Sequence, residues 1–171
     1  GLSSEQCQTV EIAALLHDLG NLHTPDSILE KRGPLDNVER SIMDQHSYET
    51  YEILRHIKGL NEIAIWAAYH HEGLNRGGYP FHPSERNFST EARVIAVADV
   101  FQALVQDRPY RTGMALSQVL SILHEMVESG KLDPDIVAFA KKHSETCFSI
   151  CKGTDPEHNQ AFINLFVDKS A

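Results

Sequence analysis

The chain has 171 residues, which is enough for one domain with a sizeable core, and its composition is that of an ordinary globular protein. Its formal net charge of −9 argues against binding a nucleic-acid polymer through a broad basic surface, but not against binding a small phosphorylated ligand. No apolar run approaches the ~20 residues that a membrane-spanning helix needs, and the N-terminus does not resemble a secretory signal.

The N-terminal segment predicts an amphipathic helix followed by an irregular stretch. Ser3-Ser4-Glu5-Gln6 resembles a capping box, and apolar residues recur after it with helical spacing until the helix ends near Gly20. Residues 24–36 are broken by proline and glycine, and they predict a loop that contains one short helical turn.

Two further helices are predicted in the next segment. Asp36 and Glu39 resemble a second capping box, which opens one long helix over 38–57. Asn61 is a candidate cap for the next helix, which covers 62–72 and ends in two adjacent histidines.

Residues 73–89 are dense in Gly, Pro, Asn and Ser and predict a loop. This loop is longer than most connections, which favours a functional role over a plain link. Ser89 or Thr90 begins a fourth helix over 91–106, and Pro109 ends that helix or lies just past its end.

The C-terminal third predicts helices over 115–129, 134–150 and 156–168, the last two beginning with proline in the first turn. No segment alternates polar and apolar residues over the length of a strand. The sequence therefore predicts an all-α protein, a compact bundle of about six to seven helices that forms a single domain over 1–171.

The three cysteines, Cys7, Cys147 and Cys151, are an odd number in a chain without a secretion signal. They indicate reduced thiols and a cytoplasmic location. Cys147 and Cys151 are one helical turn apart, but the sequence holds no second pair for a zinc site, so ordinary structural cysteines are the simpler interpretation.

Six polar residues interrupt otherwise apolar helical runs. A buried unpaired carboxylate is costly, so Asp99 needs a cationic partner, which could be a metal ion or an arginine such as Arg93. Each histidine alone is most simply a hydrogen-bonded core residue, but together these residues favour one metal site, because imidazole and carboxylate bind transition metals. The six are His17, Asp18, His46, His70, His71 and Asp99.

Several motifs, in this order along the chain, resemble those of an HD-GYP domain, a member of the HD metal-dependent phosphohydrolases. The resemblance covers about residues 2–145 and leaves 146–171 without a motif. It implies a helical bundle of the HD-domain type that hydrolyses cyclic di-GMP, or a related cyclic dinucleotide, to a linear dinucleotide or GMP. The motifs are HDLG at 17–20, His46, HHE at 70–72, GGYP at 77–80 and ADVFQAL…DRPYR at 98–111.

The resemblance also implies roles for individual residues. The six polar residues named above match the family's metal ligands, for two divalent ions that are most often iron or manganese, and Asp18 matches the bridging, catalytic carboxylate. Arg108 and Arg111 would hold substrate phosphate. The loop residues Gly77, Gly78, Tyr79 and Pro80 would face the substrate, with Tyr79 offering a ring to a guanine base or to a partner protein.

The sequence departs from the family pattern at four places. Asn21 stands where lysine is usual, and Asn75 and Arg76 stand where Asp and Gly are typical; arginine adopts a positive φ less easily than glycine. His23 and Thr24 replace residues that are usually small or apolar. The family's earlier helix, which carries a further histidine ligand, would precede Gly1. These departures leave open a second interpretation, a sensor or interaction module with little turnover that binds metal, nucleotide, or a partner such as a diguanylate cyclase or regulatory domain.

Overall fold

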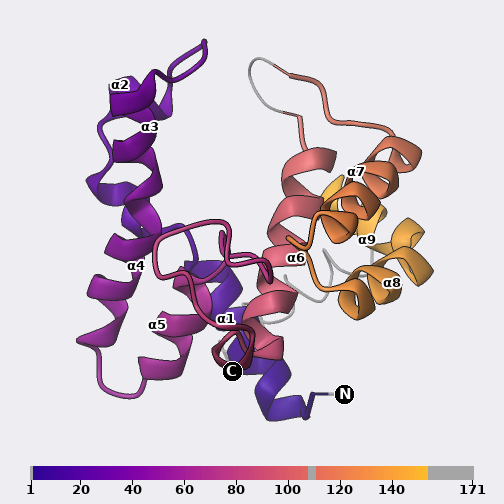
Figure 1. Cartoon of the computed structure of the whole chain (residues 1–171), viewed down its shortest axis with the longest axis horizontal. Helices are drawn as coiled ribbons and strands as arrows, with labels where there is room; N and C mark the ends of the chain where they lie inside the picture. Colours follow the sequence, from indigo (N-terminus) through magenta and orange to yellow (C-terminus); the bar gives the residue numbers. More distant parts are fainter. Residues whose placement is uncertain (1, 108–110, 154–171) are drawn as a thin grey trace, which may run out of the picture.

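All of the regular secondary structure is helical in the part that the computed structural model describes, residues 2–107 and 111–153 (Figure 1). Nine α-helices and two 3-10 helices occur there, and no β-strand does, so the predicted all-α class is confirmed. The α-helices are α1 (Ser4–Leu16), α2 (Asp26–Leu29), α3 (Asn37–Asp44), α4 (His46–Arg55), α5 (Asn61–Ala68), α6 (Thr90–Val105), α7 (Leu116–Glu128), α8 (Pro134–Lys142) and α9 (Ser144–Cys151). The 3-10 helices are η1 (Leu19–His23) and η2 (Glu85–Asn87).

The long helix α6 lies at the centre of the fold (Figure 1). It contacts α1 and α5 on one side and α7, α8 and α9 on the other. α4 packs on α5 and η1, while α2 and α3 extend from that end away from α6 (Figure 1). None of the described helices combines the length and the apolar character needed to cross a lipid bilayer.

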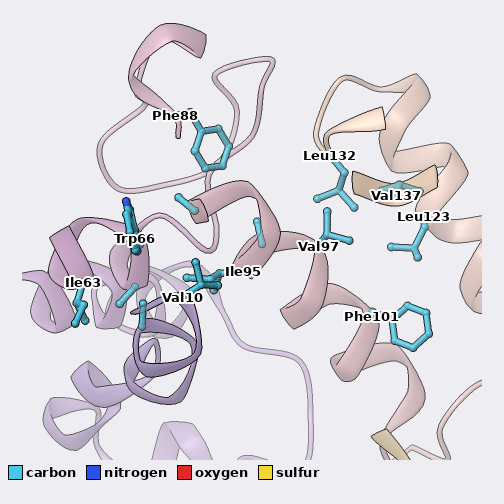
Figure 2. Close-up of a cluster of buried hydrophobic side chains, with 14 of the residues drawn as sticks. Val10, Ile63, Trp66, Phe88, Ile95, Val97, Phe101, Leu123, Leu132 and Val137 are labelled. Carbon is cyan, nitrogen blue, oxygen red and sulfur yellow. The ribbon is translucent and has the colours of Figure 1, made fainter. Parts of the chain in front are cut away.

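The hydrophobic core follows α6 on both of its sides. Figure 2 shows Ile95 beside Val10, on the side of α1 and α5, with Trp66 in the same part of the core. Val97 lies on the other side, with Leu132. None of these five residues is more than 9% exposed, so burial of apolar surface fixes α6 between the two groups of helices.

Four predicted helix starts are confirmed, among them that of α8, which begins at Pro134. The Ser3 hydroxyl accepts a hydrogen bond from the Gln6 N–H, and the Gln6 side chain accepts one from the Ser3 N–H. Asp36 and Glu39 form the same reciprocal pair at the start of α3. Ser89 caps α6 through its hydroxyl.

Several predicted helix boundaries were wrong. α1 ends at Leu16 rather than near Gly20. α5 ends at Ala68, before the histidine pair, and Asn61 is its first residue rather than its N-cap. Leu60 holds the N-cap position and makes no side-chain capping bond there.

Two predicted long helices are each split in the structure. The helix expected over 38–57 breaks at Gln45, whose N–H donates to the Ile42 and Met43 carbonyls and so tightens the last turn of α3. The helix expected over 134–150 breaks at His143 into α8 and α9. These breaks raise the helix number above the predicted six to seven. The predicted helix over 156–168 and Pro109 lie outside the described residues.

The end of α1 is fixed by its contact with α4. The Thr50 hydroxyl donates to the His17 carbonyl at 2.9 Å and accepts the Gly20 N–H at 2.8 Å. Gly20 lies so close to α4 that a Cβ atom there would stand 2.0 Å from the His46 carbonyl oxygen. Thr50 therefore satisfies backbone groups that a longer α1 would use, and the chain turns into η1 after Leu16.

We expect Gly20→Ala to lower the free energy of unfolding by about 2–3 kcal/mol, because the added methyl group must push η1 away from α4. Urea denaturation measures this change. Gly33→Ala is the matched control, since no described heavy atom lies within 4 Å of a Cβ built at Gly33. Equal stability of the two variants would contradict the close packing of η1.

We expect Thr50→Val to cost about 1–3 kcal/mol of unfolding free energy, because it leaves the partly buried His17 carbonyl and the buried Gly20 N–H without their partner. Thr50→Ser keeps the hydroxyl and should retain most of the stability in the same urea titration. Thr9→Val removes a hydroxyl that bonds only within α1, so it should change stability by no more than about 0.5 kcal/mol. A Thr50→Val loss no larger than that of Thr9→Val would refute this role.

Candidate metal centre

The six predicted ligands come from helix ends and from the middle of α6. His17 is the C-cap of α1, and Asp18 follows it directly. His46 is the first residue of α4, and His70 stands two residues after the end of α5. Asp99 alone lies well inside a helix, α6. Most of the polar residues that the sequence analysis placed inside apolar helices therefore mark the ends of those helices.

The structure brings these side chains together. Asp18 Oδ1 lies 3.4 Å from His46 Nε2 and 3.9 Å from His70 Nε2, and Asp18 Oδ2 lies 3.3 Å from His17 Nε2. His17 Nε2 also lies 3.6 Å from Asp99 Oδ1. Two overlapping groups of ligand atoms result, each with all of its atoms within 4.8 Å of one another.

His71 completes the first of these groups with His46 and His70. Its ring centre lies 4.0 Å from that of His70 and 5.1 Å from that of His46. All six predicted ligands therefore surround one small region, with His46 and His70 buried and Asp18 still 55% exposed. The exposed carboxylate leaves the centre open to a molecule from solution.

Three of the imidazoles are oriented by the same kind of hydrogen bond. Nδ1 of His17, His46 and His70 each lies close to the carbonyl oxygen three residues earlier, at 2.7, 2.7 and 2.6 Å respectively. A carbonyl can only accept, so each Nδ1 carries a hydrogen and each Nε2 is the ring nitrogen turned toward the centre. This arrangement, a donated N–H behind a free ring nitrogen, is typical of metal-ligating histidines.

The free nitrogens fit a cation well. His46 Nε2 and His70 Nε2 lie 3.1 Å apart, and in the neutral rings both are acceptors. Two facing lone pairs repel each other unless a proton or a metal ion lies against both. Together with the ionised oxygens of Asp18 and Asp99, the donor set consists of imidazole and carboxylate groups, which suits a divalent transition metal.

The local electrostatics keep His70 and His71 in the forms that bind a metal ion, whereas His17 holds a proton that a metal ion would have to displace. Burial lowers the pKa of His70 to about 3 and that of His71 to about 4, so both rings are neutral near pH 7. Burial also acts to lower the pKa of His17, but hydrogen bonds to Asp18 and Asp99 outweigh it and raise that pKa to about 10. Burial acts to raise the pKa of each carboxyl, but the hydrogen bond to His17 and the electrostatic effect of the neighbouring histidines together outweigh it, so both pKa values are lowered.

The GGYP loop, residues 73–82, covers one side of the centre. The Tyr79 ring lies 4.8 Å from the ring of His71 and 6.2 Å from that of His46, and burial together with Asp44 raises its pKa. Gly78 adopts a φ of 107° and lies so close to His71 that a Cβ atom would stand 2.2 Å from the His71 carbonyl oxygen. Gly77 lines the same cavity as His71, Gly78 and Tyr79, and Pro80 follows Tyr79 in the loop.

The predicted phosphate-binding arginines do not join this cluster in the described residues. Arg108 lies outside those residues. Arg111 donates from Nη2 to the Ala103 carbonyl near the end of α6, and its buried Nε has no partner in the described structure. The alternative pairing of Asp99 with Arg93 does not form, because the Arg93 guanidinium bonds Asp133 and backbone carbonyls, while His17 faces Asp99.

Asn21, the residue that stands where lysine is usual, lies in η1. It lines an open hollow together with Asp18 and several leucines. Its Oδ1 is buried and has no partner among the described residues.

Two supporting residues were missed by the sequence analysis. The Thr50 hydroxyl bonds the backbone of both His17 and Gly20. The sequence shows only a threonine one helical turn after His46, which does not indicate this role. Glu72 is buried, and its Oε1 accepts the N–H groups of two successive loop residues, Phe81 at 2.6 Å and His82 at 3.0 Å. HHE was quoted as a motif, but nothing in it indicated that its glutamate closes the loop.

Several known proteins align with most of this chain. The chain is 35% identical over 156 residues to the 3'3'-cGAMP-specific phosphodiesterase 1 of Vibrio cholerae, an alignment that covers 91% of this chain and 36% of that protein. It is 38% identical over 140 residues to the cyclic di-GMP phosphodiesterase response regulator RpfG of Xanthomonas campestris pv. campestris, covering 80% and 36%. It is 35% identical over 165 residues to a cyclic di-GMP phosphodiesterase of Thermotoga maritima, covering 93% and 44%.

The chain thus spans less than half the length of each of these relatives. A model of the HD domain family matches residues 1–136, which include all six predicted ligands and the GGYP loop. The chain therefore belongs to the HD domain family and is a domain of the HD-GYP type.

Proposed function

We propose that the chain is a metal-dependent phosphodiesterase domain that hydrolyses cyclic di-GMP, or a related cyclic dinucleotide, to a linear dinucleotide or GMP. The observation that carries the proposal is the convergence of three anchored imidazoles, with the Nε2 atoms of His46 and His70 3.1 Å apart beside the half-exposed Asp18. The relatives described above are named as phosphodiesterases of cyclic di-GMP or 3'3'-cGAMP, which supports this substrate class.

The proposed cofactors are two divalent metal ions, iron or manganese. Two overlapping ligand groups support the number two, and Asp18 is suited to bridge them, because its Oδ1 faces His46 and His70 while its Oδ2 faces His17. Bound divalent ions supply a hydroxide nucleophile near neutral pH by lowering the pKa of a water molecule. The proposed ligands are His17, Asp18, His46, His70, His71 and Asp99.

The chain's own residues orient the reaction. The carbonyls behind His17, His46 and His70 fix the ring positions, so these ligands need little reorganisation. Tyr79, which lies against His71, would stack on a nucleobase, and Gly77 and Gly78 let the loop backbone approach a ligand closely. Arg108 and Arg111 are proposed to hold the substrate phosphates; Arg111 has further N–H groups besides the one donated to Ala103.

We also propose that a regulatory domain or a diguanylate cyclase domain partners this domain. One relative is named as a response regulator, and the chain spans only 36% of that protein. A cytoplasmic location is proposed because Cys7, Cys147 and Cys151 are free thiols in the structure.

The test is hydrolysis of cyclic di-GMP and 3'3'-cGAMP by protein purified anaerobically and loaded with Fe(II) or Mn(II). Asp18→Asn is a nearly isosteric change at a half-exposed position. We expect it to lower turnover by more than about 100-fold, which exceeds the loss typical of residues that only hydrogen-bond to a metal ligand. Glu11→Gln, at an exposed position of α1, should leave turnover within about twofold of the wild type.

Metal content is measured on the same samples by elemental analysis. Bound metal without turnover of either substrate would reject the enzyme in favour of a binding or interaction module. Absence of bound metal after loading with either ion would reject the metal centre itself.

A further inference from the structure

The GGYP loop is fastened at two separate points. Just before the loop, Glu72 accepts the N–H groups of Phe81 and His82 and so holds the C-terminal end of the loop. At the other point, Asn75 reaches a distant part of the chain, the α7–α8 turn (residues 129–132). The function proposed above assigns no role to this second point.

Asn75 uses both ends of its side-chain amide. Its Nδ2 donates to the Ser129 carbonyl at 2.8 Å, and its Oδ1 accepts the Gly77 N–H at 2.8 Å. The backbone N–H of Asn75 donates to the Gly130 carbonyl at 2.7 Å, and that of the preceding residue to the Lys131 carbonyl at 3.2 Å. Three donors of the loop are therefore directed at successive carbonyls of the α7–α8 turn.

Hydrogen bonds matter here because packing supports residues 77–79 of the loop only in part. A cavity of about 240 Å³ lies between these residues and α6, α7 and the α7–α8 turn, next to His70 and His71. Side chains in a close-packed interior hold each other in place, but a segment over a cavity lacks that support. The cavity is lined by Gly77, Gly78 and Tyr79 on the loop side and by Val100, Met126 and Leu132 on the opposite side.

The backbone around Asn75 packs closely against the Asn75 side chain. A Cβ atom at Gly73 or Gly77 would stand 2.8 or 2.9 Å from Asn75 Oδ1, and one at Gly130 would stand 3.3 Å from Asn75 Cβ. Between Asn75 and the residues that touch the histidines stands Arg76, which adopts a left-handed φ of 61°. Only three residues separate Asn75 from Tyr79, and the backbone between them is tightly turned, so we expect a displacement of Asn75 to move Tyr79.

We propose that Asn75 is a positioning residue, whose side-chain amide couples the GGYP loop to the α7–α8 turn and thereby sets the place of Tyr79 over the metal centre. The consequence for substrate binding rests on the proposed function, whereas the coupling itself does not. Aspartate, the residue typical of the family at this position, could accept the Gly77 N–H but could not donate to the Ser129 carbonyl. The departure at Asn75 is therefore a gained contact as well as a lost charge.

Asn75→Asp tests the coupling because it keeps the local turn and the two backbone bonds, and removes only the side-chain bond to the α7–α8 turn. The first readout is the rate of trypsin cleavage between Arg76 and Gly77, identified by mass spectrometry, with amide hydrogen exchange over residues 77–80 as the second. Arg76 is exposed, so cleavage there reports opening of the loop. Asn87→Asp, which makes the same change of charge at an exposed residue of η2, is the control.

We expect Asn75→Asp to raise both rates by roughly five- to tenfold, the factor expected for one lost hydrogen bond, with metal content and the thermal midpoint near those of the wild type. In the active enzyme KM for the cyclic dinucleotide should rise by a similar factor while kcat changes little. Asn87→Asp should match the wild type in every readout.

Wild-type cleavage and exchange rates in Asn75→Asp would overturn the coupling. Faster cleavage with unchanged exchange at 77–80 would reduce Asn75 to a local turn residue and also overturn it. If the wild type hydrolyses no cyclic dinucleotide, the proposed function fails, but the cleavage and exchange rates still decide the coupling, because neither requires turnover.

Discussion

One type of hydrogen bond recurs at the centre, from a histidine Nδ1 to the carbonyl three residues earlier. Ala14, Met43 and Ala67, which accept these bonds, each lie in the last turn of a helix, α1, α3 and α5 respectively. The last carbonyls of a helix have no partner within it, and a side chain that satisfies one of them stabilises the helix end. Each bond therefore helps to end a helix and, at the same time, turns the opposite ring nitrogen toward the centre.

This arrangement concentrates acceptors in a buried space. His70 is only 2% exposed and His46 only 3%, yet their free nitrogens face each other and the oxygens of Asp18. Without a cation against both of them, the facing lone pairs of His46 and His70 repel each other where water is excluded, and this opposes folding. The contact of Thr50 with η1 holds the cluster together from behind by fixing the backbone on both sides of Asp18.

The same geometry explains which features the sequence could predict. The capping boxes at Ser3 and Asp36 depend on residues three apart, and both formed. The helix ends at Leu16 and Ala68 were predicted too late, because tertiary contacts and a histidine side chain end these helices, and neither appears in hydrophobic spacing. The histidines could be predicted as site residues, because burying an imidazole among apolar residues is costly unless it is hydrogen-bonded or binds a ligand.

Asn75 illustrates the opposite case, in which the sequence indicated only a departure from a pattern. Its partner Ser129 lies 54 residues further along the chain, so no local rule could have found the contact. Arg76 follows at a φ of 61°, a conformation that costs a non-glycine residue roughly 1–2 kcal/mol and persists only where neighbouring contacts hold the backbone. Those contacts are the bonds at Asn75 and the closure by Glu72. The two sides of the centre are thus built differently: helix ends fix the histidines within the core, whereas hydrogen bonds to Glu72 and to the α7–α8 turn hold the loop that covers them.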